Sequence, residues 1–210
     1  MIMKTLFSLI ALFISIPSAE ASEALLENFF ANVATMEANF QQKVVDETGK
    51  TLERSSGRFY LSRPGKFRWS YRSTDPGVEL GQQIIADGES IYMYDPDLEQ
   101  VTQRSMQAAL AQVPSLLLVQ SGTNLTEHFI VNDIGLTDGV SWVSLKPIAP
   151  DAGYQLLMLG FVGGQLNTIF LLDGLGNETR LVLSEVVSNL RLESSVFEFT
   201  VPEGADLLSE

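Results

Sequence analysis

Short segments in which apolar and polar residues alternate, separated by turn-forming pairs, recur along most of this chain. The pairs are Asp87-Gly88, Asp138-Gly139, Gly163-Gly164 and Asp173-Gly174. Such pairs are preferred in the tight turns that join antiparallel strands, because these residues tolerate a positive φ. The spacing therefore favours a fold built mainly from consecutive β-hairpins, and a hydrophobic content of 45% is enough for a sizeable core.

The alternation predicts about 12 antiparallel strands. It is clearest at Phe67, Trp69 and Tyr71, which are separated by Arg68 and Ser70, so one face of this strand is aromatic and the other polar. The expected strands cover residues 40–45, 55–61, 67–71, 82–86, 91–94, 99–104, 127–134, 140–146, 154–162, 166–172, 179–190 and 196–201.

Two regions depart from this period of two. Ser22 is a suitable N-cap, and the apolar residues after it recur as far as Phe40 at the three- to four-residue spacing of an amphipathic helix of about four turns. A second helical region is expected at residues 106–113 and 115–120, divided by Pro114. So few helices cannot cover a sheet of this size. The expected fold is therefore α+β but mainly β: an unclosed antiparallel β-barrel of roughly 11–12 strands with helices at its mouth.

The first 21 residues have the form of a secretory signal peptide. Lys4 supplies a positive charge, residues 6–16 are apolar, and Ala19-Glu20-Ala21 fits a signal-peptidase site. This apolar run is too short to span a bilayer core about 30 Å thick. We expect cleavage after Ala21, which leaves a single exported domain at residues 22–210.

The composition argues against several classes of function. With 13 Lys and Arg against 26 Asp and Glu, the net charge is −13, which disfavours nucleic-acid binding. The chain has no Cys and one His, which excludes thiolate metal sites, iron–sulfur clusters and thiol catalysis. No nucleotide-binding or hydrolase motif is present. We expect no enzyme activity, no metal and no cofactor.

The remaining candidates for catalysis have simpler interpretations. His128 is expected to be a partly exposed strand residue, and its sequence neighbours would point to the opposite face. Asp95 and Asp97 flank Pro96 and are expected to form a turn rather than the carboxylate pair of a glycosidase. No catalytic residue is therefore predicted.

Five segments, taken in order, resemble a known family. The two longest are GRFYLSRPGKFRW, from Gly57 to Trp69, and ADGESIYMYDPDLEQ, from Ala86 to Gln100. The shorter ones are ANFQQ at 38–42, LKP at 145–147 and FEFTVPEG at 197–204. Each fragment alone is a weak motif, but together they resemble the periplasmic outer-membrane lipoprotein carrier proteins, the lipoprotein chaperones.

The resemblance implies a half-barrel whose helical lid covers an apolar cavity for the acyl chains of lipoproteins. It implies three partners: acylated lipoproteins as cargo, an inner-membrane ABC transporter that releases them, and an outer-membrane receptor that accepts them. The receptor shares the fold but is itself a lipoprotein and needs a Cys, which this chain lacks. We therefore expect the soluble periplasmic carrier, acting as a monomer.

The resemblance also assigns residues to the site. The arginine of the R-P motif holds the lid closed through hydrogen bonds, and Arg63 is the matching position; otherwise it would be an exposed turn arginine. Phe67 and Trp69 are candidates for the cavity or for partner contact, and otherwise for ordinary core. Leu26, Phe30 and Leu117 are candidate lid residues that the sequence cannot separate from core packing.

Three other functions are compatible with parts of the sequence. A carrier of another lipid, such as a glycolipid, a polyprenoid or lipopolysaccharide, would have the same half-barrel. Periplasmic stress sensors have a domain of this fold but usually add a second domain, for which 189 residues leave no room. A lipid hydrolase is disfavoured by the single His and the lack of a nucleophile motif.

Overall fold

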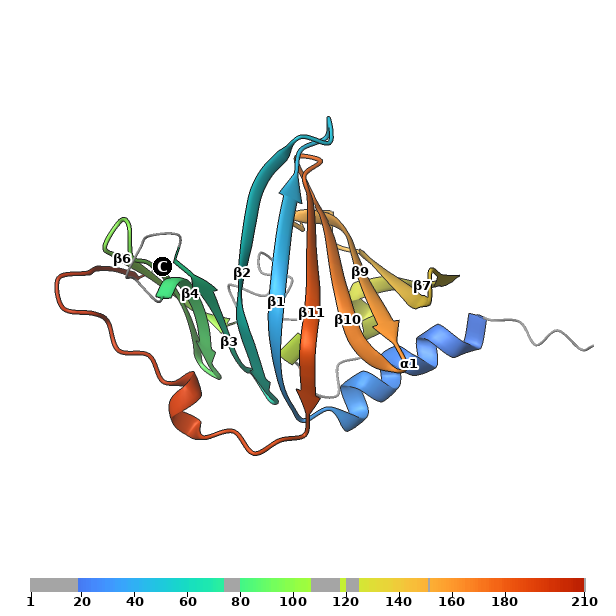
Figure 1. Cartoon of the computed structure of the whole chain (residues 1–210), viewed down its shortest axis with the longest axis horizontal. Coiled ribbons are helices and arrows are strands. Elements are labelled where there is room, and N and C mark those ends of the chain that lie inside the picture. Colours follow the sequence, from blue (N-terminus) through green and yellow to red (C-terminus); the bar gives the residue numbers. More distant parts are fainter. Residues whose placement is uncertain (1–18, 74–79, 107–117, 120–124, 151, 210) are drawn as a thin grey trace, which may run out of the picture.

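The computed structural model describes residues 19–73, 80–106, 118–119, 125–150 and 152–209. Twelve strands form one strongly curved sheet in the order β12-β6-β5-β4-β3-β2-β1-β11-β10-β9-β8-β7 (Figure 1). Among the described strands, no pairing joins the two ends of this order, so the barrel stays open. The expected unclosed β-barrel is confirmed.

The strands differ in length, and β1, β2 and β11 are the longest. Their bounds are β1 Thr35–Val45, β2 Thr51–Ser62, β3 Lys66–Arg72, β4 Leu80–Asp87, β5 Ser90–Asp95, β6 Gln100–Ser105, β7 Phe129–Thr137, β8 Val140–Pro147, β9 Tyr154–Val162, β10 Gln165–Asp173, β11 Glu178–Ser188 and β12 Asp206–Ser209. The helical elements are α1 Ala19–Asn32, α3 Leu125–His128 and the 3-10 helix η2 Ser194–Phe197.

The core lies on one face of the sheet, called here the inner face. Alternate residues of each strand point to this face, so Phe59 and Leu61 of β2 and Phe67 and Trp69 of β3 are buried together. Helix α1 runs across this side and contacts β7 and β8 (Figure 1). The opposite face, called the outer face, carries the polar residues of the same strands.

The hairpin turns form where the sequence predicts them. Asp138 and Gly139 both have positive φ, 51° and 78°, as a tight turn between β7 and β8 requires. At the turn after β5, the Asp95 carboxylate accepts hydrogen bonds from the backbone N–H groups of Asp97 and Leu98. The turn interpretation of Asp95 and Asp97 is therefore correct.

The first helix has about the four turns predicted but lies nearer the N-terminus: it spans Ala19–Asn32, so Ser22 lies within it and is not its N-cap. It ends at Asn32, and β1 begins at Thr35, so the expected helix through residue 40 is wrong. Met36 and Phe40 lie four residues apart and fit a helical face, but they also fit a period of two. In the structure they point inward from β1 with Ala38. Pairing of β1 with both β2 and β11 decides in favour of the strand.

The C-terminal region also departs from the prediction. Residues 196–201 form no strand: η2 and an extended segment take their place and cover part of the outer face. The ring of Phe199 packs on Tyr92 with a centroid distance of 5.2 Å. The chain then adds β12 as an edge strand, parallel to β6, where we expected antiparallel pairing only. Similarly, residues 125–128 form α3, so His128 ends a short helix and is not a strand residue.

Several expectations lie outside the described residues. These are the signal segment up to residue 18, most of the helical region at 106–120 with Pro114, and Leu117. Within the parts of the chain that are described, no helix is long and apolar enough to cross a membrane.

Candidate functional site

An apolar pocket of about 150 Å³ lies on the inner face of the sheet. Its walls come from strands on both halves of the sheet and from Leu118. The lining residues are Gln42, Trp69, Ile84, Leu118, Leu157, Leu159, Ile169, Leu171, Thr179 and Leu181. A pocket with this lining can bind aliphatic chains but offers little to a polar ligand.

Helix α1 and residues 118–119 cover the inner face. Leu26 and Phe29 of α1 are buried in the same core cluster as Leu118 and Val119. The Phe29 ring meets Phe161 of β9 edge-on, with centroids 6.1 Å apart. These contacts are apolar and non-directional, so they do not by themselves fix the position of the cover.

Arg63 provides directional contacts to both parts of the cover. It lies in the turn between β2 and β3, and its guanidinium donates hydrogen bonds to the carbonyl oxygens of Phe29, at 2.9 Å, and Val33. Its Nε donates to the carbonyl oxygen of Leu118 at 3.0 Å. The last carbonyls of a helix lack partners within the helix, so a multi-donor cation is well suited to them. One side chain thus joins the end of α1 to residue 118.

The surroundings of the Arg63 guanidinium are largely apolar. It lies over the rings of Phe29 and Phe30, at 4.6 Å and 4.9 Å from their centroids. Burial lowers the pKa of Arg63 to about 10, because the protein shields the charge from water. Its Nη2 is buried and has no hydrogen-bond partner among the described residues. Removing the guanidinium from water therefore costs free energy, and its hydrogen bonds to the carbonyl groups offset only part of this cost.

The backbone of the same turn strengthens this arrangement. The Arg63 N–H donates to the Ala34 carbonyl at 2.8 Å, and the Gly65 N–H donates to the Val119 carbonyl at 2.9 Å. Gly65 has a φ of 76°, which only glycine adopts readily, and the Arg63–Pro64 peptide bond is cis. The backbone of the R-P-G turn thus contacts residue 119 of the cover and the segment directly after α1, in addition to the contacts of the Arg63 side chain.

The other predicted site residues are distributed between the pocket and the core. Trp69 lines the pocket, stacked on Phe59 at a centroid distance of 4.1 Å. Phe67 is fully buried and lies outside the pocket lining. On α1, Leu26 is buried and Phe30 is partly buried against the core. Leu117 lies outside the described residues.

Several site residues were missed from the sequence. The apolar walls on β9, β10 and β11, including Leu157 and Leu171, were read only as strand core, and the inner face of these strands was the available signal. Phe29 lies within the predicted helix, but it is not among the residues expected at the site. Its carbonyl oxygen and its ring both contact Arg63, and no pattern of residues in the sequence predicts these contacts.

No catalytic arrangement accompanies the pocket in the described residues. His128 is exposed at the end of α3. No group of three or more His, Asp or Glu side chains able to hold a metal ion is found in the described part of the chain. The site is thus an apolar pocket under a cover that an arginine ties to the sheet, and the fold and site define a half-barrel protein suited to hydrophobic ligands.

The chain belongs to the outer membrane lipoprotein carrier protein family, LolA, whose family model matches residues 31–200. Two curated relatives are named outer-membrane lipoprotein carrier protein. The relative in Dechloromonas aromatica is 38% identical to this chain, over 88% of this chain and 86% of the relative. The relative in Methylobacillus flagellatus is 37% identical, over 88% of this chain and 87% of its own. The expected family is confirmed.

Solved structures share the fold at low sequence identity. A domain from Vibrio parahaemolyticus, assigned to outer membrane lipoprotein sorting, aligns with a TM-score of 0.51 at 12% identity, covering 86% of this chain and 96% of that one. An uncharacterized conserved protein from Thermus thermophilus aligns with a TM-score of 0.50 at 13% identity, covering 92% of this chain and 100% of its own. These likenesses support the architecture alone.

Proposed function

We propose that this chain carries lipoproteins, binding their acyl chains on the inner face of the sheet. The observation that carries the proposal is the apolar pocket on the inner face, lined in part by Leu118, on the same side of the sheet as α1; Arg63 holds both α1 and Leu118 to the sheet. The family relationship agrees with it, since the relatives are named as carriers of outer-membrane lipoproteins. The residues that line the pocket are suited to binding an apolar ligand rather than to catalysis.

The pocket in this structure corresponds to a closed state. Its volume of about 150 Å³ is below the roughly 300–1,000 Å³ typical of sites for drug-sized ligands. An acyl chain therefore requires displacement of α1 and of residues 118–119. Arg63 is the latch in this scheme, because its carbonyl partners lie on the parts that must move.

Acyl-chain burial is strong enough to compensate for breaking the latch. Each buried CH₂ contributes roughly 0.8 kcal/mol, so one 16-carbon chain contributes about 12 kcal/mol. Three such chains would exceed the practical affinity limit of about 18–21 kcal/mol, and release would then be too slow. We therefore infer incomplete burial, with closure of the cover helping to expel the chains.

The remaining steps require other proteins. The chain has no nucleotide-binding motif, so loading depends on an energised donor, for which an inner-membrane ABC transporter is the candidate. Delivery requires an outer-membrane receptor of higher affinity. The signal-like segment at residues 1–21 supports export to the periplasm, with residues 22–210 as one carrier domain.

A displacement assay tests this function. A hydrophobic fluorescent probe should bind the free protein and be displaced by an acylated peptide but not by the same peptide without its acyl chain. Equal displacement by both peptides would contradict acyl-chain binding. Native mass spectrometry of protein isolated from periplasm should show triacylated lipoprotein as cargo; another bound lipid would favour a carrier of that lipid.

A further inference from the structure

The positive charge of this chain is concentrated in the first three strands. Residues 35–72 contain eight Lys or Arg and four Asp or Glu, whereas the rest of the chain contains five and 22. This region is thus net positive in a protein of net charge −13. Six of these cations lie on the outer face of the strands: Lys43, Arg54, Arg58, Lys66, Arg68 and Arg72.

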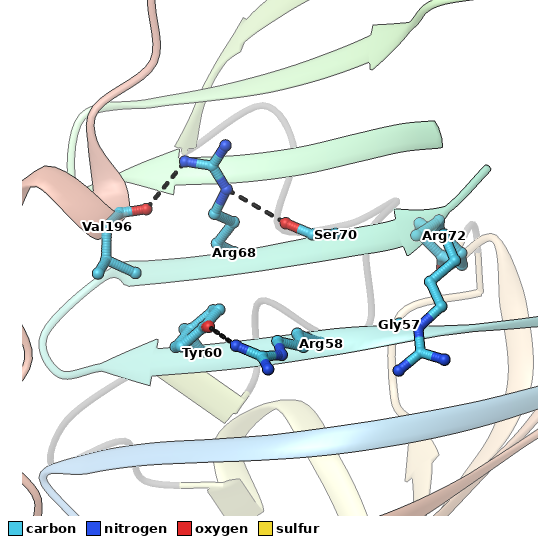
Figure 2. A pocket seen from close by; sticks show the side chains of 8 residues that line it. Gly57, Arg58, Tyr60, Arg68, Ser70, Arg72 and Val196 are labelled. Carbon is cyan, nitrogen blue, oxygen red and sulfur yellow. Dashed lines mark hydrogen bonds between the residues drawn. The ribbon is translucent and has the colours of Figure 1, made fainter. Parts of the chain in front are cut away.

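The strand register places three of these arginines around one hollow. Arg58 pairs across the ladder with Ser70, and Tyr60 pairs with Arg68. A hollow of about 510 Å³ opens between them, with Arg72 at its far end and Val196 of the C-terminal segment as a wall. Figure 2 shows Arg68 beside Val196, and Arg72 extending from the end of β3 toward β2. This arrangement is termed here the cationic hollow.

The three guanidinium groups differ in how firmly they are held. Arg68 donates to Ser70 Oγ at 3.2 Å, to the Val196 carbonyl at 3.1 Å and to Gln83, so it is fixed in place. Arg58 donates to the Tyr60 hydroxyl at 3.4 Å. Arg72 is exposed and makes no hydrogen bond or ion pair with the described residues. Arg58 and Arg72 therefore retain donors for an external anion.

Few carboxylates compensate for this charge. Glu37 lies 4.0 Å from Arg58 at the edge of the hollow. The pKa of Arg58 is raised mainly by its hydrogen bond to Tyr60, and Glu37 and Glu185 add weaker attractions. Among the described residues, no acidic side chain forms an ion pair with Arg68 or Arg72. The hollow thus keeps an excess of positive charge, because only Arg58 of its three arginines has an acidic partner among the described residues.

We propose that the cationic hollow docks an acidic segment of a partner protein. A recessed site walled by the C-terminal segment suits carboxylate side chains that project into it. A flat anionic bilayer would instead meet the acidic flanks of the domain as well as the hollow. Guanidinium groups bind carboxylates through two parallel N–H donors, which favours a specific contact.

The position of the hollow separates docking from cargo binding. Arg58 and Arg68 point outward from the strands whose Phe59 and Trp69 point inward, so the hollow and the apolar pocket lie on opposite faces of the sheet. A partner bound at the hollow leaves the inner face free to load or release acyl chains. The identity of the partner, a donor or receptor of lipoproteins, rests on the proposed function. The docking of an acidic segment does not depend on that function.

Fluorescence anisotropy of the full chain with a labelled peptide of alternating Glu and Ala tests the proposal. We expect saturable binding that weakens with salt, and no binding of the counterpart in which Gln replaces Glu. The variant R58Q/R72Q should bind the Glu peptide about tenfold more weakly. The control K43Q/R54Q removes two cations from the same face, beyond the hollow, and should change binding less than about twofold.

Each other outcome would overturn the proposal. An equal loss of peptide affinity in the two variants would mean that the peptide is attracted by the overall positive charge of the outer face and not by the hollow. Equal binding of the Gln peptide would exclude carboxylate recognition. Binding of phosphatidylglycerol vesicles but not of the Glu peptide would assign the hollow to membranes. The hydrophobic probe should bind R58Q/R72Q and wild type equally, which separates failure of docking from failure of cargo binding.

Discussion

The guanidinium of Arg63 lies 3.0 Å from the carbonyl oxygen of Leu118 and is at the same time bonded to the end of α1. Two segments far apart in the sequence are thus joined through one turn residue of the sheet. Because every hydrogen-bond acceptor is a backbone carbonyl, these bonds depend on the position of the cover, while the rings of Phe29 and Phe30 add side-chain contacts to the same guanidinium. Opening the cover must break these bonds together.

Arg63→Leu should favour the open state. Each lost hydrogen bond to a charged donor removes about 1.5–3 kcal/mol from the closed state. The variant should still accept lipoprotein but deliver it poorly, because closure no longer helps to expel the chains. A two-step transfer assay that scores loading and delivery separately measures this. Arg54→Leu, on the outer face of β2, is the matched control and should behave as wild type in both steps.

Arg63→Lys should rescue delivery only in part. An ammonium group cannot reproduce the planar fork that reaches Phe29, Val33 and Leu118 together. Delivery should lie between wild type and Arg63→Leu in the same assay. Normal delivery by Arg63→Leu would contradict the latch and leave Arg63 as a turn residue.

Leu171→Trp should reduce binding of acyl chains by filling the inner pocket. Leu171 lines the pocket, and the larger side chain would take up part of its free volume of about 150 Å³ and divide what remains. Overpacking should cost about 1–3 kcal/mol of unfolding free energy, which a stable domain survives. Leu175→Trp is the control, since Leu175 is 83% exposed in a turn. Probe affinity equal in the two variants would place the acyl site elsewhere.

Phe67→Glu should unfold the domain rather than block loading selectively. Phe67 is fully buried in the core, so its replacement combines loss of packing with an unpaired buried charge and costs at least about 4 kcal/mol. Circular dichroism and urea unfolding measure this. A folded Phe67→Glu protein that fails to load would instead show that this position becomes accessible to cargo or donor. Phe67→Leu keeps the core apolar and should remain folded.

Tyr71 should make the protein sensitive to alkali. Burial, aided by the charge of Glu53, raises the pKa of Tyr71 to about 12. The folded state therefore holds this proton more tightly than the unfolded state, and stability falls as pH rises from about 10 to about 12. Between pH 9 and pH 11, which spans about half of the fall, Tyr71→Phe should remove about 1–1.5 kcal/mol of it. Urea unfolding at pH 9 and pH 11 compares the slopes; an equal slope in both proteins would mean that Tyr71 does not contribute.

The mature protein should begin at Ser22. The site at Ala19-Glu20-Ala21 predicts this cleavage, and the product should fractionate with soluble periplasmic proteins. Intact-mass measurement of the periplasmic fraction checks it. Retention of Met1 in a membrane fraction would contradict the export prediction.

Local patterns in the sequence determined most of the sheet. A period of two marks inward residues such as Phe67 and Trp69, and pairs such as Asp138-Gly139 permit only a few backbone conformations. These signals lie within a few residues, so they predict strands and turns without knowledge of the fold. They fail at Met36 and Phe40, where one spacing satisfies both a helix and a strand and only pairing with β2 and β11 decides.

The tertiary structure alone decided what Arg63 and the outer arginines do. The carbonyl groups that Arg63 contacts belong to residues 30 to 55 positions away, and backbone carbonyls have no sequence signature. Likewise, the alternation shows that Arg58 and Arg68 point away from the core, but not that they enclose a hollow with Val196, which lies 128 positions after Arg68. Such sites depend on the curvature of the whole sheet and the path of its C-terminal segment. Both result from long-range packing, which no local pattern encodes.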